Sequence, residues 1–400
     1  MLRFAGRQFP GWNPVVEFEE GLGGNVEDAQ LFAPWVVYHW MVDGRPVVDW
    51  YQEMQGKRLS SDELAWLAAQ RRAWLSIWEV LEVNPGENVT VRDLLSGEER
   101  LVHEVSGSRM VVKRDTVLGR VVDDEGISVF CGMHPRPLPP LEADKVVREA
   151  GRELRVRSRP VSVDRLRQEE TTDMLIGLWY AVAGELDHKP LPRLNNTDGD
   201  ELLLCVDHFD VAPGTGDAVA ARLRALDDIR AADEEGTLEV TFLRQGNAMH
   251  ASWENTIVGR AMFAKGRLKV ETNSARRADL LRRTVEDACA GLVVHRVREH
   301  EDVTALVAKA RETSPQKRKQ RSAEELAIER EFKTRHYSEW VHEPLPALDG
   351  ATPLDAVRKP AGKRKVELLL REFENHESRL PEDERFDISL LRRELGLSTD

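Results

Sequence analysis

The sequence predicts an α+β protein, and three observations indicate this class. Short runs with strand alternation, separated by turns rich in Gly and Asp, occupy residues 77–134. Strand-like runs combined with two amphipathic helical patterns follow between residues 202 and 298. Residues 336–400 contain helical patterns and one extended loop. We therefore expect an aromatic helical lead with a small β-barrel, a central antiparallel sheet with helices, and a C-terminal helical hairpin.

Changes in composition divide the 400 residues into four expected regions. Residues 1–140 should form the helical lead and the barrel, ending in the proline-rich stretch "HPRPLPP". Residues 141–300 are expected to form an α+β sandwich, and residues 301–335 a charged linker that leads into a helix. Residues 336–400 should form a C-terminal helical segment. A chain of this length is expected to bury more than one core.

The first region begins with aromatic-rich helical patterns and continues with strands. Trp35 and Tyr38 lie at helical spacing, which is typical of core residues, and Ser60 and Glu63 have the spacing of a capping box. Five runs follow from Ile77, namely "IWEVLEVN", "VTVRDLL", "ERLVHEV", "TVLGRVVD" and "ISVFCGM". Their spacing suits a small barrel. Because the runs alternate Val and Leu with charged residues and add no aromatic platform, we expect a structural or docking module.

The central region has the pattern of a sheet covered by helices on one face. Helices are expected at "GDAVAARLRALDDI" and "SARRADLLRRTVEDACA". In the second helix Ser274 is the natural N-cap, Ala278, Leu281 and Val285 belong to the buried stripe, and the arginines between them should face water. The expected strands are "ELLLCVDHF", "LEVTFLR", "AMHASWE", "IVGRAMFA", "RLKVETN" and "GLVVHRVRE".

The C-terminal segment carries unusually clear local signals. Trp340 should end a helix, and the extended loop "EPLPALDG" follows. Thr352 is expected as an N-cap, with Pro353 at the first helical position and Asp355 completing a capping box. A short helix is therefore predicted to begin at Pro353.

A second helix of this segment, "KRKVELLLREFE", should follow Gly362, which separates the two. Apolar residues recur in it at positions 366, 369, 370 and 373, which is helical spacing. The hairpin is too small to bury this apolar stripe alone. It is expected to pack on its own chain, on a second copy or on a partner protein.

Charge and cysteine usage exclude several classes of protein. The net charge of −13 disfavours nonspecific phosphate binding, which leaves two local basic stretches at residues 152–167 and 314–322 as a nucleic-acid alternative. The start of the chain has no apolar h-region and no long apolar run follows, so we expect a cytoplasmic protein without a membrane segment. Cys131, Cys205 and Cys289 form no C-x-x-C pair, and each is expected as a reduced, buried thiol.

The acidic stretch "NNTDGDELLLCVDHFD" is the strongest candidate for chemistry, but its spacing does not suit a metal. A calcium loop needs oxygen ligands at alternate positions, and "DGDE" supplies only a fragment. Asp207 and His208 would point to opposite faces of a strand, whereas Asp198 belongs to a turn. "APGTGDAV" lacks the third glycine of a dinucleotide fingerprint and the Lys-Ser/Thr pair of a P-loop. We predict no catalytic residue, metal or cofactor, and keep a metal-dependent enzyme centred here as an alternative.

The tail pattern "W…P…ALDGATPLDAV…G…VELLL" resembles the C-terminal signature of Xre/MbcA/ParS-type antitoxin proteins, in which this end binds the toxin. The tail, together with "ETNSARRADLLRR" and "VRDLLSGEERLVHEVSGSRMVV", also resembles uncharacterised bacterial proteins that carry a SEC-C zinc motif. The zinc motif itself is absent, and no helix-turn-helix precedes the tail, so neither metal nor DNA binding carries over. The positions that match the tail motif are Trp340, Pro344, Leu348, Gly350, Thr352 and Pro353.

The resemblance implies that these six residues bind a partner, whereas a structural role would be to fix the loop and the helix start. We therefore expect a non-catalytic interaction or regulatory protein that binds an unidentified protein partner through the C-terminal hairpin. The alternative is a nucleic-acid-binding protein that uses the barrel and the basic stretches near Arg155 and Lys317.

Overall fold

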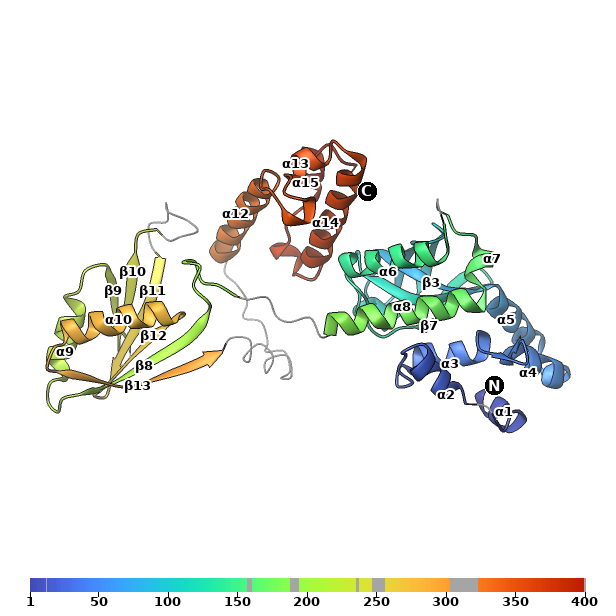
Figure 1. Ribbon diagram of the computed structural model, residues 1–400, viewed down its shortest axis with the longest axis horizontal. Helices are drawn as coiled ribbons and strands as arrows, with labels where there is room; N and C mark the ends of the chain where they lie inside the picture. Colours follow the sequence, from blue (N-terminus) through green and yellow to red (C-terminus); the bar gives the residue numbers. More distant parts are fainter. Residues whose placement is uncertain are drawn as a thin grey trace. The chain divides into compact units, whose positions relative to one another are not determined.

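The computed structural model confirms the α+β class and contains two compact units (Figure 1). The first unit comprises Met1–Lys189 and Gln320–Asp400, and the second comprises Pro190–Lys319. No helix within the described parts of the chain is long and apolar enough to cross a membrane. The structure describes residues 1–11, 13–156, 160–187, 194–234, 237–246, 256–302 and 323–398.

The first unit opens with short helices and a small β-hairpin. The predicted capping box is confirmed, because the Glu63 backbone N–H donates to Ser60 Oγ at 3.2 Å and the Ser60 N–H donates to Glu63 Oε2 at 2.8 Å. The elements are α1 (Leu2–Gln8), α2 (Pro14–Val16), a π-helix (Glu17–Gly21), α3 (Ala29–Tyr38), β1 (Met41–Val42), β2 (Arg45–Pro46), α4 (Val47–Gln55), a 3-10 helix (Gly56–Arg58) and α5 (Ser61–Arg72).

A closed five-stranded barrel follows, as the sequence predicted. Its strands pair in the order β3-β4-β5-β7-β6, and β5 meets β7 in parallel at Val102 and Ser128. The strands are β3 (Trp74–Asn84), β4 (Asn88–Asp93), β5 (Glu99–His103), β6 (Thr116–Asp124) and β7 (Ile127–Met133), and a 3-10 helix (Gly107–Arg109) lies between β5 and β6.

Three helices after the barrel share its core. They are α6 (Pro140–Glu153), α7 (Val163–Leu166) and α8 (Glu169–Asp187). Trp179 of α8 is buried in one core with Trp35, Trp74 and Trp78, so the aromatic cluster is core as expected. The structure differs here from the expected boundary at residue 140, because the apolar faces of α6 and α8 cover the barrel and leave the second unit to begin at Pro190.

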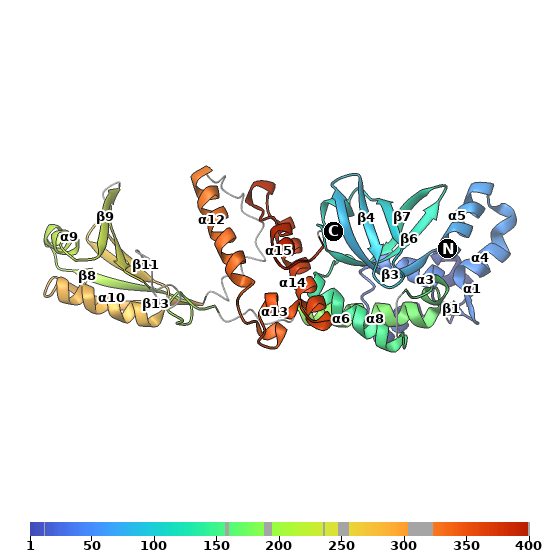
Figure 2. The ribbon, with the colours of Figure 1, turned by 90° about the horizontal axis from the view of Figure 1, so that it is seen from above.

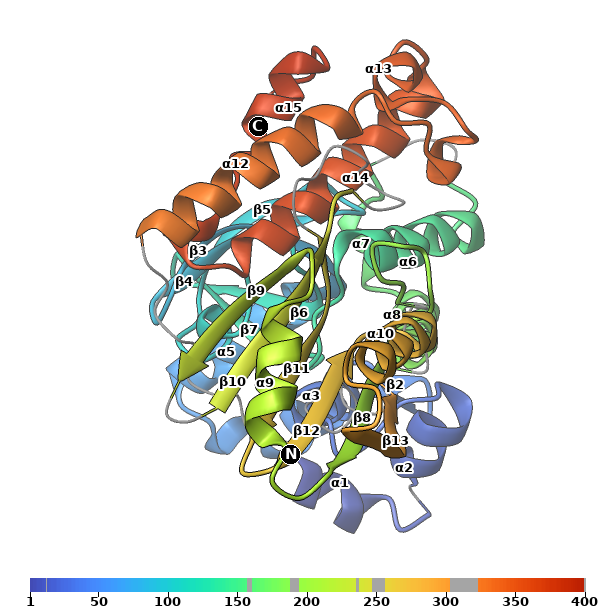
Figure 3. The ribbon, with the colours of Figure 1, turned by 90° about the vertical axis from the view of Figure 1, so that its left-hand side faces the viewer.

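The second unit is a six-stranded antiparallel sheet with the strand order β13-β8-β12-β11-β10-β9 (Figure 3). Helices α9 and α10 bury Val219, Leu223, Leu281 and Val285 in a single core against it. Strand β9 was not predicted, and "AMHASWE" lies outside the described residues. The elements are β8 (Leu203–Val211), α9 (Gly216–Arg224), β9 (Ile229–Glu234), β10 (Thr237–Arg244), β11 (Thr256–Ala264), β12 (Arg267–Thr272), α10 (Ala275–Ala288) and β13 (Val293–Asp302).

The C-terminal segment forms a small helical core of its own. Val366 and Leu370 of the predicted stripe are buried against residues of α12 and α15, including Trp340 and Leu391. The stripe therefore packs on its own chain. The elements are α12 (Ala323–Trp340), a 3-10 helix (Pro346–Leu348), α13 (Pro353–Ala356), α14 (Pro360–Ser378), a 3-10 helix (Glu382–Glu384) and α15 (Ser389–Glu394).

Candidate functional site

The six residues of the tail motif divide into a buried and an exposed group. Trp340 and Leu348 are only 6% and 4% exposed, and Pro353 is buried as well. Pro344, Gly350 and Thr352 remain at least partly accessible. Because the buried members fill the core of the segment, they stabilise it, and only the surface around them is open to a partner.

The loop between α12 and α13 is held by backbone hydrogen bonds and by the predicted cap. The Asp355 N–H donates to Thr352 Oγ1 at 3.1 Å, which confirms Thr352 as the N-cap of α13 and Pro353 as its first residue. Leu345 and Gly350 are joined by a backbone hydrogen bond of 3.0 Å from the Gly350 N–H. Asp349 and Gly350 both have positive φ, 58° and 82°, so the chain turns sharply at this point.

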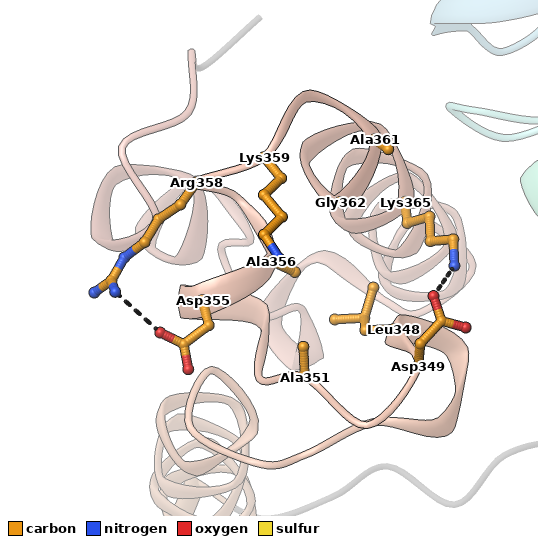
Figure 4. A pocket seen from close by; sticks show the side chains of 10 residues that line it. All are labelled: Leu348, Asp349, Ala351, Asp355, Ala356, Arg358, Lys359, Ala361, Gly362 and Lys365. Atoms are coloured by element: carbon orange, nitrogen blue, oxygen red, sulfur yellow. Dashed lines mark hydrogen bonds and ion pairs between the residues drawn. The ribbon is translucent and has the colours of Figure 1, made fainter.

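A pocket of about 500 Å³ opens beside this loop (Figure 4). Its walls come from the 3-10 helix Pro346–Leu348, from α13 and from the start of α14. Small apolar groups supply one part of the lining, namely Leu348, Ala351, Ala356, Ala361 and Gly362. This part of the lining offers an apolar surface. We call this site the C-terminal pocket.

Charged side chains supply the rest of the lining. Lys365 Nζ lies 2.7 Å from Asp349 Oδ2, and Arg358 Nη1 lies 3.2 Å from Asp355 Oδ1. Lys359 has no ion-pair partner within the described residues, and in Figure 4 its side chain extends toward Ala356 between the two ion pairs. Lys359 is also the N-cap of α14, where the helix dipole adds partial positive charge. The pocket thus has an uncompensated positive charge beside an apolar surface.

Gly362 allows α13 and α14 to pack closely against each other. A Cβ atom at this position would lie 2.2 Å from the Ala356 carbonyl oxygen, so any side chain would force the two helices apart. The sequence interpretation placed Gly362 between two helices, but α14 begins at Pro360 and Gly362 lies in its first turn. Proline at the first helical position was the signal that this interpretation overlooked.

Charged and amide side chains join the C-terminal segment to the barrel of the same unit. Figure 2 shows α14 next to α6. Asp115, which is fully buried, accepts a hydrogen bond of 2.8 Å from Asn375 Nδ2 and a further one from Arg379. Arg114 Nε donates to Glu374 Oε2 at 2.6 Å. Burial raises the pKa of Asp115 above its ordinary value. The pocket lies at the start of α14, and the other end of α14 is bound to the barrel by these contacts.

The acidic residues considered for a metal are held by arginine instead. The side chain of Asp198 is 3% exposed and accepts from Arg277 Nε and Nη2 at 2.9 and 2.8 Å. Arg277 was expected to face water, but it is 3% exposed because it points from α10 beneath the turn that carries Asp198. Asp207 accepts from Arg298 Nε at 2.8 Å and pairs with His295 Nε2 at 2.7 Å. The described residues contain no group of three or more His, Cys, Asp or Glu that could hold a metal ion.

The nucleic-acid alternative depends on two basic stretches and the barrel surface. Residues 314–322, including Lys317, and residues 157–159 lie outside the described residues. Arg167 of the first stretch pairs with Asp164 at 2.9 Å. The barrel strands carry Trp74 and Trp78, both buried, so neither ring is available to stack on a base.

Comparison with known proteins gives one match of limited extent. A family model described as a family of unknown function (DUF7986) matches residues 21–136, from the end of the π-helix to the end of the barrel. No curated protein matches the chain. The matched residues leave out the C-terminal segment, so its resemblance to antitoxins stays a prediction.

Proposed function

We propose that the chain is a non-catalytic protein-interaction protein whose C-terminal pocket binds an acidic segment of a partner protein. One observation carries the proposal: Lys359 has no ion-pair partner within the described chain and lies beside an apolar pocket of about 500 Å³. A carboxylate next to an apolar side chain matches both parts of this lining.

The tail motif predicts that its own six residues contact the partner, whereas the contacts proposed here involve the residues that line the C-terminal pocket. Trp340 and Pro353 are buried and do not line the pocket, whereas Leu348, Lys359 and the alanines do. The ion pairs of Arg358 and Lys365 are exposed and individually weak, so a partner carboxylate can exchange with them at little cost.

The site is preorganised, which reduces the entropy lost on binding. The Thr352 cap fixes the start of α13, and the close approach at Gly362 fixes the start of α14. The far end of α14 is attached to the barrel through Glu374 and Asn375. Because neither wall of the pocket is a free loop end, we expect binding without folding of the segment.

The experiment selects binding peptides with the full-length protein from a random displayed library. We expect enriched peptides to contain Asp or Glu beside an apolar residue. Affinities are then measured by calorimetry. Lys359→Glu should weaken binding by at least about tenfold because it opposes the peptide carboxylate. The matched control is Lys363→Glu, an exposed lysine on the same helix outside the pocket lining, which should change the affinity by no more than about twofold.

Two outcomes would overturn the proposal. The first is a selection that enriches no acidic motif. The second is equal loss of affinity in the two lysine variants, which would indicate general charge attraction. If the protein instead retains single-stranded nucleic acid with a steep dependence on salt, and Lys359→Glu leaves that binding unchanged, the nucleic-acid alternative takes precedence.

A further inference from the structure

The C-terminal segment and the barrel of the first unit bury their apolar side chains in separate cores. Trp78 and Leu118 belong to a core that the barrel shares with α3, α6 and α8. Trp340, Val366 and Leu391 belong to the core of α12, α14 and α15. Within the described residues, no buried apolar side chain belongs to both cores. The apolar residues of the segment are therefore buried by the segment itself.

Polar side chains make the contact between these two cores. The barrel side contributes three buried charged residues, and the end of α14 contributes four charged or amide residues. They are Glu79, Arg114, Asp115, Arg371, Glu374, Asn375 and Arg379. We call these seven residues the polar interface.

Asn375 lies at the centre of the polar interface. Its Nδ2 donates to Asp115 Oδ1 at 2.8 Å and to the Lys113 carbonyl oxygen at 3.1 Å. Asp115 is 0% exposed and Asn375 is 3% exposed, so this contact is closed to water. Arg379 also donates to Asp115, and its side chain is 45% exposed, which places it at the rim.

Other contacts of the polar interface are incompletely satisfied. Arg371 Nη1 donates to Glu79 Oε1 at 3.3 Å, but Arg371 Nε is buried without a hydrogen-bond partner among the described residues. Glu79 Oε2 accepts no hydrogen bond there, and its ion pair with Arg114 Nη1 is 3.5 Å long. Desolvation offsets much of the attraction in such buried ion pairs. The interface therefore fixes the orientation of α14 more than it adds net stability.

The covalent chain does not hold the segment on the barrel. The second unit, Pro190–Lys319, lies between α8 and α12 in the sequence. The segment is thus joined to the barrel by non-covalent contacts and not by a short connection. A polar contact between separately packed bodies is the kind at which bodies move relative to each other.

We propose that the C-terminal segment is a detachable body, which separates from the barrel at the polar interface while both apolar cores stay folded. Separation uncovers Glu79, Arg114 and Asp115 on the barrel, so docking of the segment controls access to this charged face. Every residue that lines the C-terminal pocket belongs to the segment, and the pocket moves with it. This inference does not rest on the proposed binding of an acidic partner.

The test labels carboxyl groups of the full-length protein with a water-soluble carbodiimide and glycine ethyl ester, followed by mass spectrometry of the peptides. Asp115 reports separation, because its Oδ1 atom contacts Asn375 of the segment. Two other buried carboxyls report unfolding. Asp93 accepts a hydrogen bond from Trp74 inside the barrel, and Glu377 accepts one from Tyr337 inside the segment.

Two variants weaken the polar interface from the side of the segment. Asn375→Asp places a second carboxylate against Asp115 and should raise the labelling rate of Asp115 about tenfold, because like charges repel strongly when buried. Arg379→Gln removes a cation from the rim and should raise this rate about threefold. The matched control is Asn84→Asp at an exposed position of the barrel, which should leave the rate unchanged.

The labelling of Asp93 and Glu377 should stay unchanged in all three variants. An unchanged rate at Asp115 in both interface variants would overturn the proposal, because the segment would then be fixed on the barrel. A rise at Asp93 or Glu377 equal to that at Asp115 would also overturn it, because separation would then require unfolding.

Discussion

Arg277 in the second unit and Arg120 in the first are both buried arginines, but their partners differ. Arg277 donates twice to the Asp198 carboxylate and also to Ile257 O, Asn273 Oδ1 and Thr197 Oγ1, at 3.0 to 3.1 Å. All its nitrogens are therefore satisfied and its charge is compensated. Arg120 has two oxygens of Gln70 and the ring of Tyr38 as partners, and its Nε is unsatisfied among the described residues.

The burial of a charged side chain therefore does not by itself reveal whether the side chain stabilises the fold. A buried arginine whose donors and charge are satisfied ties elements together, as Arg277 ties α10 to the turn at residues 196–200. A buried arginine without a carboxylate partner contributes less to stability. Its positive charge is not compensated and can act electrostatically on a neighbouring group. We therefore expect the two residues to respond differently to the same substitution.

The largest expected effect comes from removing the partner of Arg277. Asp198→Ala should lower the free energy of unfolding of the second unit by about 3–5 kcal/mol, because it leaves Arg277 and Arg244 without their carboxylate. Hydrogen exchange in urea should follow this loss in peptides of the second unit. The control is Asp210→Ala, whose side chain is exposed and whose ion pair is 3.7 Å long, and which should change stability by less than about 0.5 kcal/mol.

Two further buried arginines, Arg114 and Arg392, extend the comparison to the C-terminal segment. Glu374 pairs with Arg114 at 2.6 Å and with Arg392 at 2.7 Å. Glu374→Gln should cost about 1–3 kcal/mol, because Arg114 and Arg392 each lose one of their two carboxylate partners and keep only Glu79 and Glu367. Faster proteolysis at the junction of α14 and the barrel should report this loss of stability. The exposed control Glu382→Gln should leave the cleavage rate unchanged, and equal rates in the two variants would contradict a structural role for Glu374.

The same pairs predict how stability depends on pH. Burial opposes ionisation of Asp198 and Glu374, but their arginine partners prevail and lower the pKa of both carboxyls. The folded state then binds fewer protons than the unfolded state. The stabilisation is complete above the ordinary values of 3.8 and 4.5 and is lost as pH falls through the lower folded pKa values. Denaturation curves in acid should show this loss in wild type and less of it in Asp198→Ala.

The smallest expected effect concerns Asp173, whose contribution to stability falls as pH rises, in contrast to that of Asp198 and Glu374. Burial and the nearby carboxylates raise the pKa of Asp173 to about 6, although a hydrogen bond from Trp35 opposes this shift. The folded state therefore binds an extra proton between the ordinary value of 3.8 and about 6, and stability contributed here falls as pH rises through that window. Asp173→Asn should stabilise the first unit by about 1 kcal/mol at neutral pH and remove this dependence. An unchanged pH profile would contradict the assignment.

Local signals in the sequence predicted much of the fold. The alternating runs and their turns predicted the barrel, and Ser60, Ser274 and Thr352 predicted helix starts that the structure confirms. Strand β9 was missed because "IRAADE" has few β-branched residues, and its pairing with β10 decides its conformation. Such pairing is a tertiary effect.

The candidate sites were less accessible to sequence reasoning. Arg120 alternates with apolar residues in β6, which predicts an outward position, but α5 covers that face and buries it. The contacts of Cys131 with Gln70 and of Glu374 with Arg114 join residues 61 and 260 positions apart. No periodic pattern encodes such distances. For Lys359 and Gly362 the signal existed, because Pro360 marks the start of α14.

The most direct test of the contrast makes one substitution at both arginines. Arg277→Met and Arg120→Met are compared with wild type by hydrogen exchange in urea, which reports on each unit separately. We predict a loss of about 3 kcal/mol in the second unit for Arg277→Met and a change within about 1 kcal/mol in the first unit for Arg120→Met. Equal losses at the two positions would contradict this difference, because Arg120 would then stabilise the fold as Arg277 does.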